Sequence, residues 1–156
     1  MLWAAWPVVA RAQETPAPKP EGELRADAIV NRTRTVVQIG AGVQIPAGYY
    51  ARIGVVGALG ADATVADGSN RQLNARVDVL GRFLLDPFRQ TRWGLSLGAG
   101  VSVRAEPARP LRPFLVAVID LEGPRAAGGV SPALQVGLGG GVRIGGALRW
   151  GHVAAR

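Results

Sequence analysis

Cysteine is absent from this 156-residue sequence, and histidine and lysine occur once each. Without cysteine there is no disulfide, no thiol nucleophile and no cysteine-ligated metal or iron–sulfur centre. The single histidine, His152, excludes a multi-histidine metal site. Ser96 and Ser102 lie among glycines, and no sequence spacing places either hydroxyl beside His152 as a nucleophile. A nucleophile and its base must lie within hydrogen-bond reach, so we expect a non-enzymatic protein with no metal and no cofactor.

Long hydrophobic runs and concentrated charge are also absent. No run of 18 apolar residues occurs, which excludes a conventional transmembrane helix. The sequence is 48% hydrophobic and 19% charged, so it is not a disordered tail, and its length suits one domain. The formal charge is +7, but the arginines are spread along the chain rather than gathered in a patch. We therefore expect no nucleic-acid partner.

The first 32 residues differ from the rest in composition. Leu2–Ala10 is a short apolar stretch, and Ala10 and Ala12 supply small residues at the positions that an exporting peptidase reads. Residues 1–12 therefore resemble the second half of a secretory signal peptide, without its basic start. Residues 13–32 are rich in proline at first and are interpreted as a flexible leader. The folded domain is predicted over residues 33–153.

Alternation with period two dominates this predicted domain. Between 92 and 104, Trp93, Leu95 and Leu97 alternate with Gly94, Ser96 and glycines that follow. Segments 33–45, 49–65 and 73–85 repeat the pattern, and 111–122 repeats it less cleanly. Such alternation predicts strands with one apolar face, and frequent glycine disfavours helices.

The predicted strands are separated by short turns rich in glycine, proline and aspartate. Short links require antiparallel hairpins, because parallel neighbours need long crossovers. The last stretch, 133–150, keeps its parity through Gly145-Gly146, so it is one long strand or two strands joined by a hairpin there. A further strand over 24–31 is also open. The fold class is therefore all-β, an antiparallel up-and-down meander closing into a small barrel of six to eight strands.

The polar face of the strands indicates which side of this barrel is inside. It consists of glycine, serine and glutamine with a few arginines and acids, whereas an exposed face avoids glycine. Small residues suit a narrow lumen, and a uniformly aliphatic face suits lipid. Strands of about 12 residues, tilted by ~40°, span roughly 30 Å, enough for the ~25 Å apolar band of an outer-membrane barrel.

Two groups of side chains are predicted to matter in such a barrel. Buried charges must pair, so a salt-bridged lumen network is expected, with an arginine-lined anion path as the alternative. Its members are Arg34, Arg52, Arg76, Asp78, Arg82, Asp120, Glu122 and Arg143. Tyr49, Phe83 and Trp93 share one end and the lipid-facing parity, as in an interfacial aromatic girdle, and Trp150 falls at the opposite rim if the last strand is continuous.

The signal-like start, the glycine-alternating strands and the segment WGLSLGAGVSVR resemble small bacterial outer-membrane β-barrel proteins over residues 33–150. The resemblance implies a bacterial outer-membrane location, lipid as the partner, and a structural or lipid-surface role. Small members of that class commonly have eight strands, whereas the pattern here gives six or seven. The alternatives are a soluble, exported lipocalin-like barrel that binds a small apolar ligand, located in the periplasm or secreted, and an interaction module with an open sheet edge.

Overall fold

The computed structural model describes residues 19–63, 72–88, 90–107, 109–126 and 128–151, which form eight β-strands. Within these ranges no helix is long and apolar enough to cross a membrane. The strands are β1 (Glu21–Val30), β2 (Thr35–Pro46), β3 (Ala51–Asp62), β4 (Leu73–Leu84), β5 (Gly94–Glu106), β6 (Arg109–Glu122), β7 (Val130–Leu138) and β8 (Val142–Gly151).

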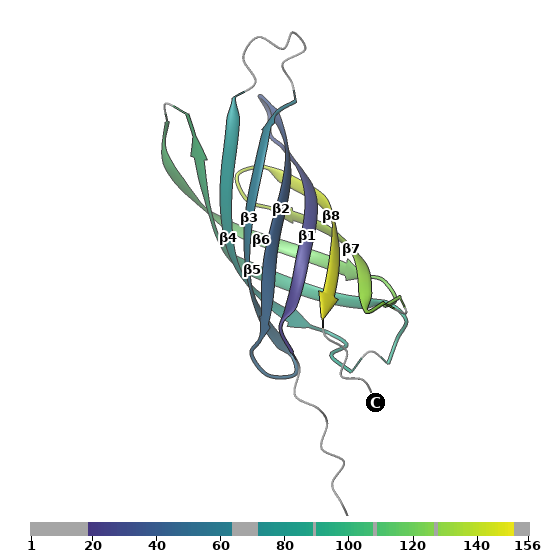
Figure 1. The fold of residues 1–156 in the computed structure, drawn as a ribbon. Helices are drawn as coiled ribbons and strands as arrows, with labels where there is room; N and C mark the ends of the chain where they lie inside the picture. The colour runs from purple at the N-terminus through teal and green to yellow at the C-terminus, as the bar shows by residue number, and fades with distance from the viewer. Residues whose placement is uncertain (1–18, 64–71, 89, 108, 127, 152–156) are drawn as a thin grey trace, which may run out of the picture.

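Each strand pairs antiparallel with the next, and β8 pairs with β1 to close the barrel (Figure 1). The closing pair runs without interruption from Glu21 opposite Gly151 to Val30 opposite Val142. The predicted all-β meander is therefore confirmed as an eight-stranded closed barrel.

The two strands that the sequence left uncertain lie at this closure. β1 occupies residues that were interpreted as part of a flexible leader, and it is hydrogen-bonded on both sides. The last stretch is two strands, but its hairpin is at Gly139–Gly141 rather than at Gly145-Gly146, which lie inside β8. Gly140 and Gly141 have φ values of +67° and +145°, which favour glycine, and this is why the chain turns there.

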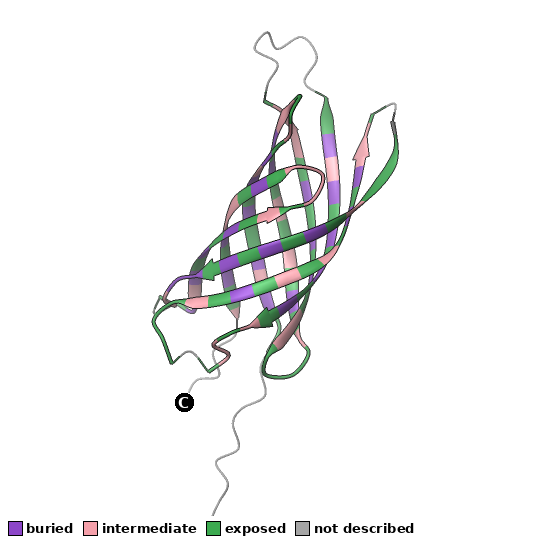
Figure 2. Ribbon diagram, turned by 180° about the vertical axis from the view of Figure 1, so that it is seen from behind, coloured by how far each residue is buried: buried purple, intermediate pink, exposed green. Residues whose placement is uncertain are grey.

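The barrel has charged side chains inside and apolar side chains outside. Buried and exposed residues alternate along the strands (Figure 2). The buried hydrophobic cluster is small and consists of Leu80, Val116 and Val118. Large exposed apolar side chains occur on every strand, among them Leu24, Ile39, Leu59, Val79, Leu97, Ile119, Leu134 and Ile144.

The two ends of the barrel differ. At the terminal end, β1 begins and β8 ends. At the other, the hairpin end, β1–β2, β3–β4, β5–β6 and β7–β8 are joined. The wall is lower at β7–β8, because β7 pairs with β6 only from Ala117 to Glu122. The first half of β6, residues 109–116, therefore has no strand on its β7 side, and the β5–β6 hairpin projects beyond the shorter β7–β8 hairpin (Figure 1).

Glycines on the lumen side let the strands pack closely. A Cβ atom on Gly100 would lie 1.9 Å from the Val79 carbonyl oxygen, whereas one on Gly57, on the outer face, would meet nothing within 4 Å. An alanine at either position changes strand propensity, but only an alanine at position 100 meets a neighbouring strand. Comparing the two therefore isolates the steric role of the inner glycine.

We expect Gly100→Ala to destabilise the folded barrel by about 1–3 kcal/mol, because the methyl group forces β4 and β5 apart. Gly57→Ala, the matched control, leaves stability unchanged or slightly raised. The measurement is urea-induced unfolding of the full chain in maltoside micelles. Equal effects of the two substitutions would show that the inner glycine is not required for strand packing.

Candidate functional site in the barrel lumen

The strand alternation delivers charged side chains into the lumen from opposite walls. Twelve charged residues of the described chain are buried, six arginines and six carboxylates. The arginines are Arg25, Arg76, Arg82, Arg104, Arg143 and Arg149, and the acids are Glu21, Glu23, Asp27, Asp78, Asp120 and Glu122. We call these twelve residues the lumen charge network. Its formal charge is zero, so the net positive charge of the chain belongs to residues outside it.

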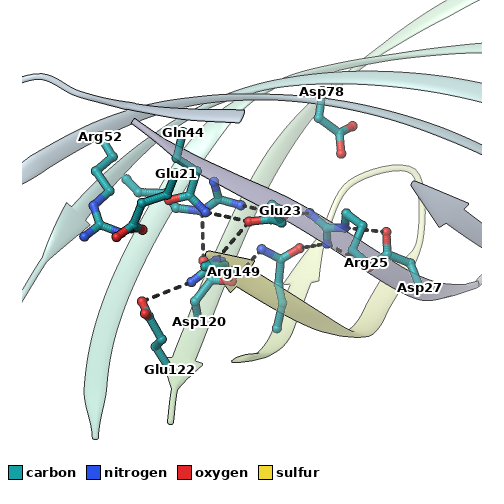
Figure 3. Close-up of polar contacts among 12 residues, drawn as sticks. Glu21, Glu23, Arg25, Asp27, Gln44, Arg52, Asp78, Asp120, Glu122 and Arg149 are labelled. Atoms are coloured by element: carbon teal, nitrogen blue, oxygen red, sulfur yellow. Dashed lines mark hydrogen bonds and ion pairs between the residues drawn. The ribbon is translucent and has the colours of Figure 1, made fainter. Parts of the chain in front are cut away.

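Arg149 of β8 is the centre of the half of the network nearest the terminal end (Figure 3). Its guanidinium donates to Glu23 of β1 at 2.9 Å and to Asp120 of β6 at 3.0 Å, and it lies 3.5 Å from Glu122. Asp120 also accepts a hydrogen bond from Arg82 of β4 at 3.0 Å. One arginine thus ties together three strands, and a shared carboxylate adds a fourth.

Asp27 of β1 is the centre of the other half. It accepts hydrogen bonds from Arg25 at 2.7 and 2.9 Å and from Arg76 of β4 at 2.5 Å, and Arg143 of β8 lies 3.5 Å away. Arg143 also pairs with Asp78, which lies 3.2 Å from Arg76. Two carboxylates and three arginines therefore form one cluster across β1, β4 and β8.

Arg25 and Gln135 connect the halves, and Gln44 adds β2 to the terminal half. Arg25 lies 3.2 Å from Glu23 and donates to Gln135, which in turn donates to Asp120 at 2.7 Å. Gln44 of β2 donates to Glu23 at 2.5 Å. The result is a continuous set of hydrogen bonds across the lumen, which stiffens the wall and occupies the interior.

Smaller ion pairs lie at the two rims. At the terminal end, Glu21 accepts from Arg52 at 2.5 Å and from Arg125 at 2.6 Å. At the hairpin end, Arg34 pairs with Glu106, which also accepts from Asn74 at 3.1 Å.

The predicted lumen residues divide between these places. Arg76, Asp78, Arg82, Asp120, Glu122 and Arg143 lie buried in the network, whereas Arg34 and Arg52 lie half-buried at opposite rims. The sequence prediction missed all four charged residues of β1, as well as Arg104 and Arg149. Their signal was present: Glu21, Glu23, Arg25 and Asp27 alternate with small or apolar residues, which is a strand pattern.

The aromatic side chains gather at the terminal end. Tyr49, Phe83 and Trp93 lie there together, as expected from their turns. Trp150 lies at the same end, because the hairpin at Gly139–Gly141 reverses the chain; the opposite rim was expected only for a continuous last strand. The sequence prediction omitted two more members, Tyr50 and Phe88. The Tyr50 ring stacks on Phe83 with centroids 5.9 Å apart, and Phe88 lies 6.1 Å from Tyr50.

The residues that the sequence analysis considered for catalysis are two serines and one histidine. Ser96 and Ser102 are buried in the lumen, and His152 lies outside the described residues. The described ranges contain no cluster of three or more histidine, cysteine or acidic residues arranged to hold a metal ion. No protein-family model matches the chain, and no curated protein matches its sequence.

We expect Glu23→Gln to cost about 3–5 kcal/mol of stability, because it leaves Arg149 and Arg25 buried with a neutral partner. Glu23 is fully buried, and its side chain touches arginines from two strands. The control is Arg92→Gln, a change of one charge at an exposed position between β4 and β5. Urea unfolding in maltoside micelles measures both; a loss for Glu23→Gln no larger than that for the control contradicts a structural role for the network.

Proposed function

We propose that this chain is a small, non-enzymatic β-barrel of the bacterial outer membrane, with a structural or lipid-surface role and a lumen closed by arginine–carboxylate pairs. The observation that carries the proposal is the inverted distribution of polarity. Twelve charged side chains are buried, while large apolar side chains are exposed on all eight strands.

Water is a poor solvent for this outer surface. Soluble monomers rarely expose contiguous apolar patches larger than a few hundred Å². Here the exposed apolar residues continue around the barrel, since neighbouring strands place Val55, Val79 and Val101 side by side. A hydrocarbon surrounding satisfies this belt, and a closed barrel leaves few backbone groups unpaired in lipid.

Strand length and the aromatic rim agree with a membrane span. β2 to β6 contain 12 to 14 residues; at ~3.3 Å per residue and a tilt of ~40°, such strands reach about 30–35 Å, more than the ~25 Å apolar band. The exposed rings of Tyr49, Phe83, Trp93 and Trp150 suit the interface at the terminal end. The signal-peptide-like start would direct the chain to export.

The lumen favours a structural role over transport or apolar-ligand binding. A barrel of eight strands is filled by its own side chains, and here these side chains bond to one another across the interior. An arginine-lined anion path needs unpaired cations along the length of the lumen, whereas five of the six buried arginines pair with acids. A lipocalin-like barrel needs an apolar interior, whereas buried polar and charged residues outnumber buried hydrophobic ones in the described chain.

We expect Val79→Arg to block insertion of the refolded chain into lipid vesicles, at a cost of about 2–4 kcal/mol near the bilayer midplane. Val79 lies midway along β4 and is half exposed on the outer face. The measurement is the fraction of chain that floats with vesicles and resists added protease, with Val79→Ala as the matched control. If the arginine variant inserts as well as the alanine control, the outer face does not meet lipid. The same conclusion follows if the arginine variant folds as a barrel in buffer without detergent and is more soluble there than the alanine control.

A further inference from the structure

Arg104 of β5 differs from the other buried arginines. It is 3% exposed, yet it forms no ion pair with a carboxylate of the described chain. Each of the other five buried arginines pairs with at least one acid, at distances of 3.2 Å or less. Arg104 is thus a buried cation whose charge no direct partner neutralises.

The contacts of its guanidinium are weak ones. One terminal nitrogen lies 3.5 Å from the carbonyl oxygen of Gly139, and the Nε atom has no hydrogen-bond partner. The group lies over the ring of Phe114, 5.1 Å from its centroid. The β7–β8 hairpin packs against both side chains, since a Cβ on Gly140 would lie 3.1 Å from Phe114 and 3.2 Å from Arg104.

The surrounding charges leave one positive charge in surplus. The acids that act on Arg104 from a distance are Glu106 and Asp78. Glu106 pairs with Arg34, and Asp78 pairs with Arg143. The sixth buried acid of the network, Glu21, is engaged by Arg52 and Arg125 at the far end of the barrel. The other five buried acids of the network are therefore matched by the other five buried arginines, and Arg104 has no acid of its own.

The fold lowers the wall beside this residue. β6 has no β7 partner over residues 109–116, which include Phe114. Leu115 follows Phe114 on the outer face and is 85% exposed, the highest value among the large apolar side chains of the described chain. A ligand could therefore bring a polar group to the lumen side of this notch and an apolar chain to its outer side.

We propose that Arg104 binds a monovalent oxyanion, a carboxylate or phosphodiester group, at the hairpin end of the lumen. Arginine suits these groups because its planar fork can donate two parallel hydrogen bonds to them. One bound negative charge neutralises the surplus and gives the Nε–H an acceptor, which removes a cost of burial. An anion site goes beyond the structural role proposed above. Its test needs only the folded chain, so its outcome is independent of whether the chain lies in a membrane.

The test follows the arginine Nε–H resonances of the ¹⁵N-labelled full chain, folded in uncharged maltoside micelles. Acetate, dimethyl phosphate and dodecanoate are titrated separately, with sodium chloride as the ionic-strength control. We expect one Nε–H resonance to shift saturably with an oxyanion and not with chloride. Arg104→Gln removes that resonance and weakens binding at least about tenfold. Arg32→Gln, which removes an exposed arginine from the β1–β2 turn at the same end, leaves the resonance and the affinity unchanged.

The probes also identify the source of the anion. Half-saturation by dodecanoate more than about tenfold below that by acetate assigns the site to an amphiphile, and equal values assign it to a free anion. No saturable shift in the parent, or a shift kept in Arg104→Gln, overturns the proposal. If Arg104→Gln does not fold, the Arg104 resonance is assigned in the parent by its proximity to the Phe114 ring, and the absence of a saturable shift there is equally decisive.

Discussion

Neutralisation of charge inside the lumen is the constraint on which the rest of this structure depends. A buried ion costs several kcal/mol unless a partner of opposite charge and further hydrogen bonds compensate it. Some of these pairs form within one strand, but Arg82, Arg143 and Arg149 find their acids on other strands, so compensation is complete only when the barrel is closed. Closure and charge pairing therefore support each other, and the inner glycines supply the space that long arginine side chains require.

β1 contributes more to this balance than any other strand. It supplies Glu21, Glu23 and Asp27, half of the six buried acids, as well as Arg25. It also supplies the edge to which β8 binds. Without β1, Arg149 and Arg143 would each lose an acidic partner, and the sheet would stay open. The strand that completes the sheet is thus also the strand that neutralises the lumen.

Much of the fold could be predicted from the sequence, because strand alternation is a local property. The outward parity of Leu97 and the inward parity of Asp120 were both evident from it. β1 was left open as a strand over 24–31 and its start was assigned to a leader, because four charges in seven residues beside a proline-rich stretch resemble a solvated segment. The parity of Trp150 was predictable, but its end of the barrel was not, since that depends on which glycine pair forms the hairpin. Arg104 could not have been distinguished, because the lack of a partner depends on three-dimensional neighbours.

The hairpin end of the barrel has an exposed strand edge on β6, where β7 does not reach. The lower wall leaves one edge of β6 exposed. The backbone amide of Gly123 donates to the Pro132 carbonyl on the β7 side, and every second amide back along β6 points to that same side. By that alternation, position 113 would direct its amide to the open side, and it is a proline, which has none. A proline at an exposed edge opposes pairing with another chain. The edge is thus protected from strand addition.

The proposal that this barrel is embedded in a membrane is tested most directly by electrophoresis of the full chain in sodium dodecyl sulfate, after refolding into maltoside micelles, with and without boiling. A closed barrel with buried ion pairs resists the detergent and keeps a compact shape, so the unboiled sample should migrate faster. Identical mobility of the two samples, together with full solubility of the folded chain in buffer without detergent, would contradict the account.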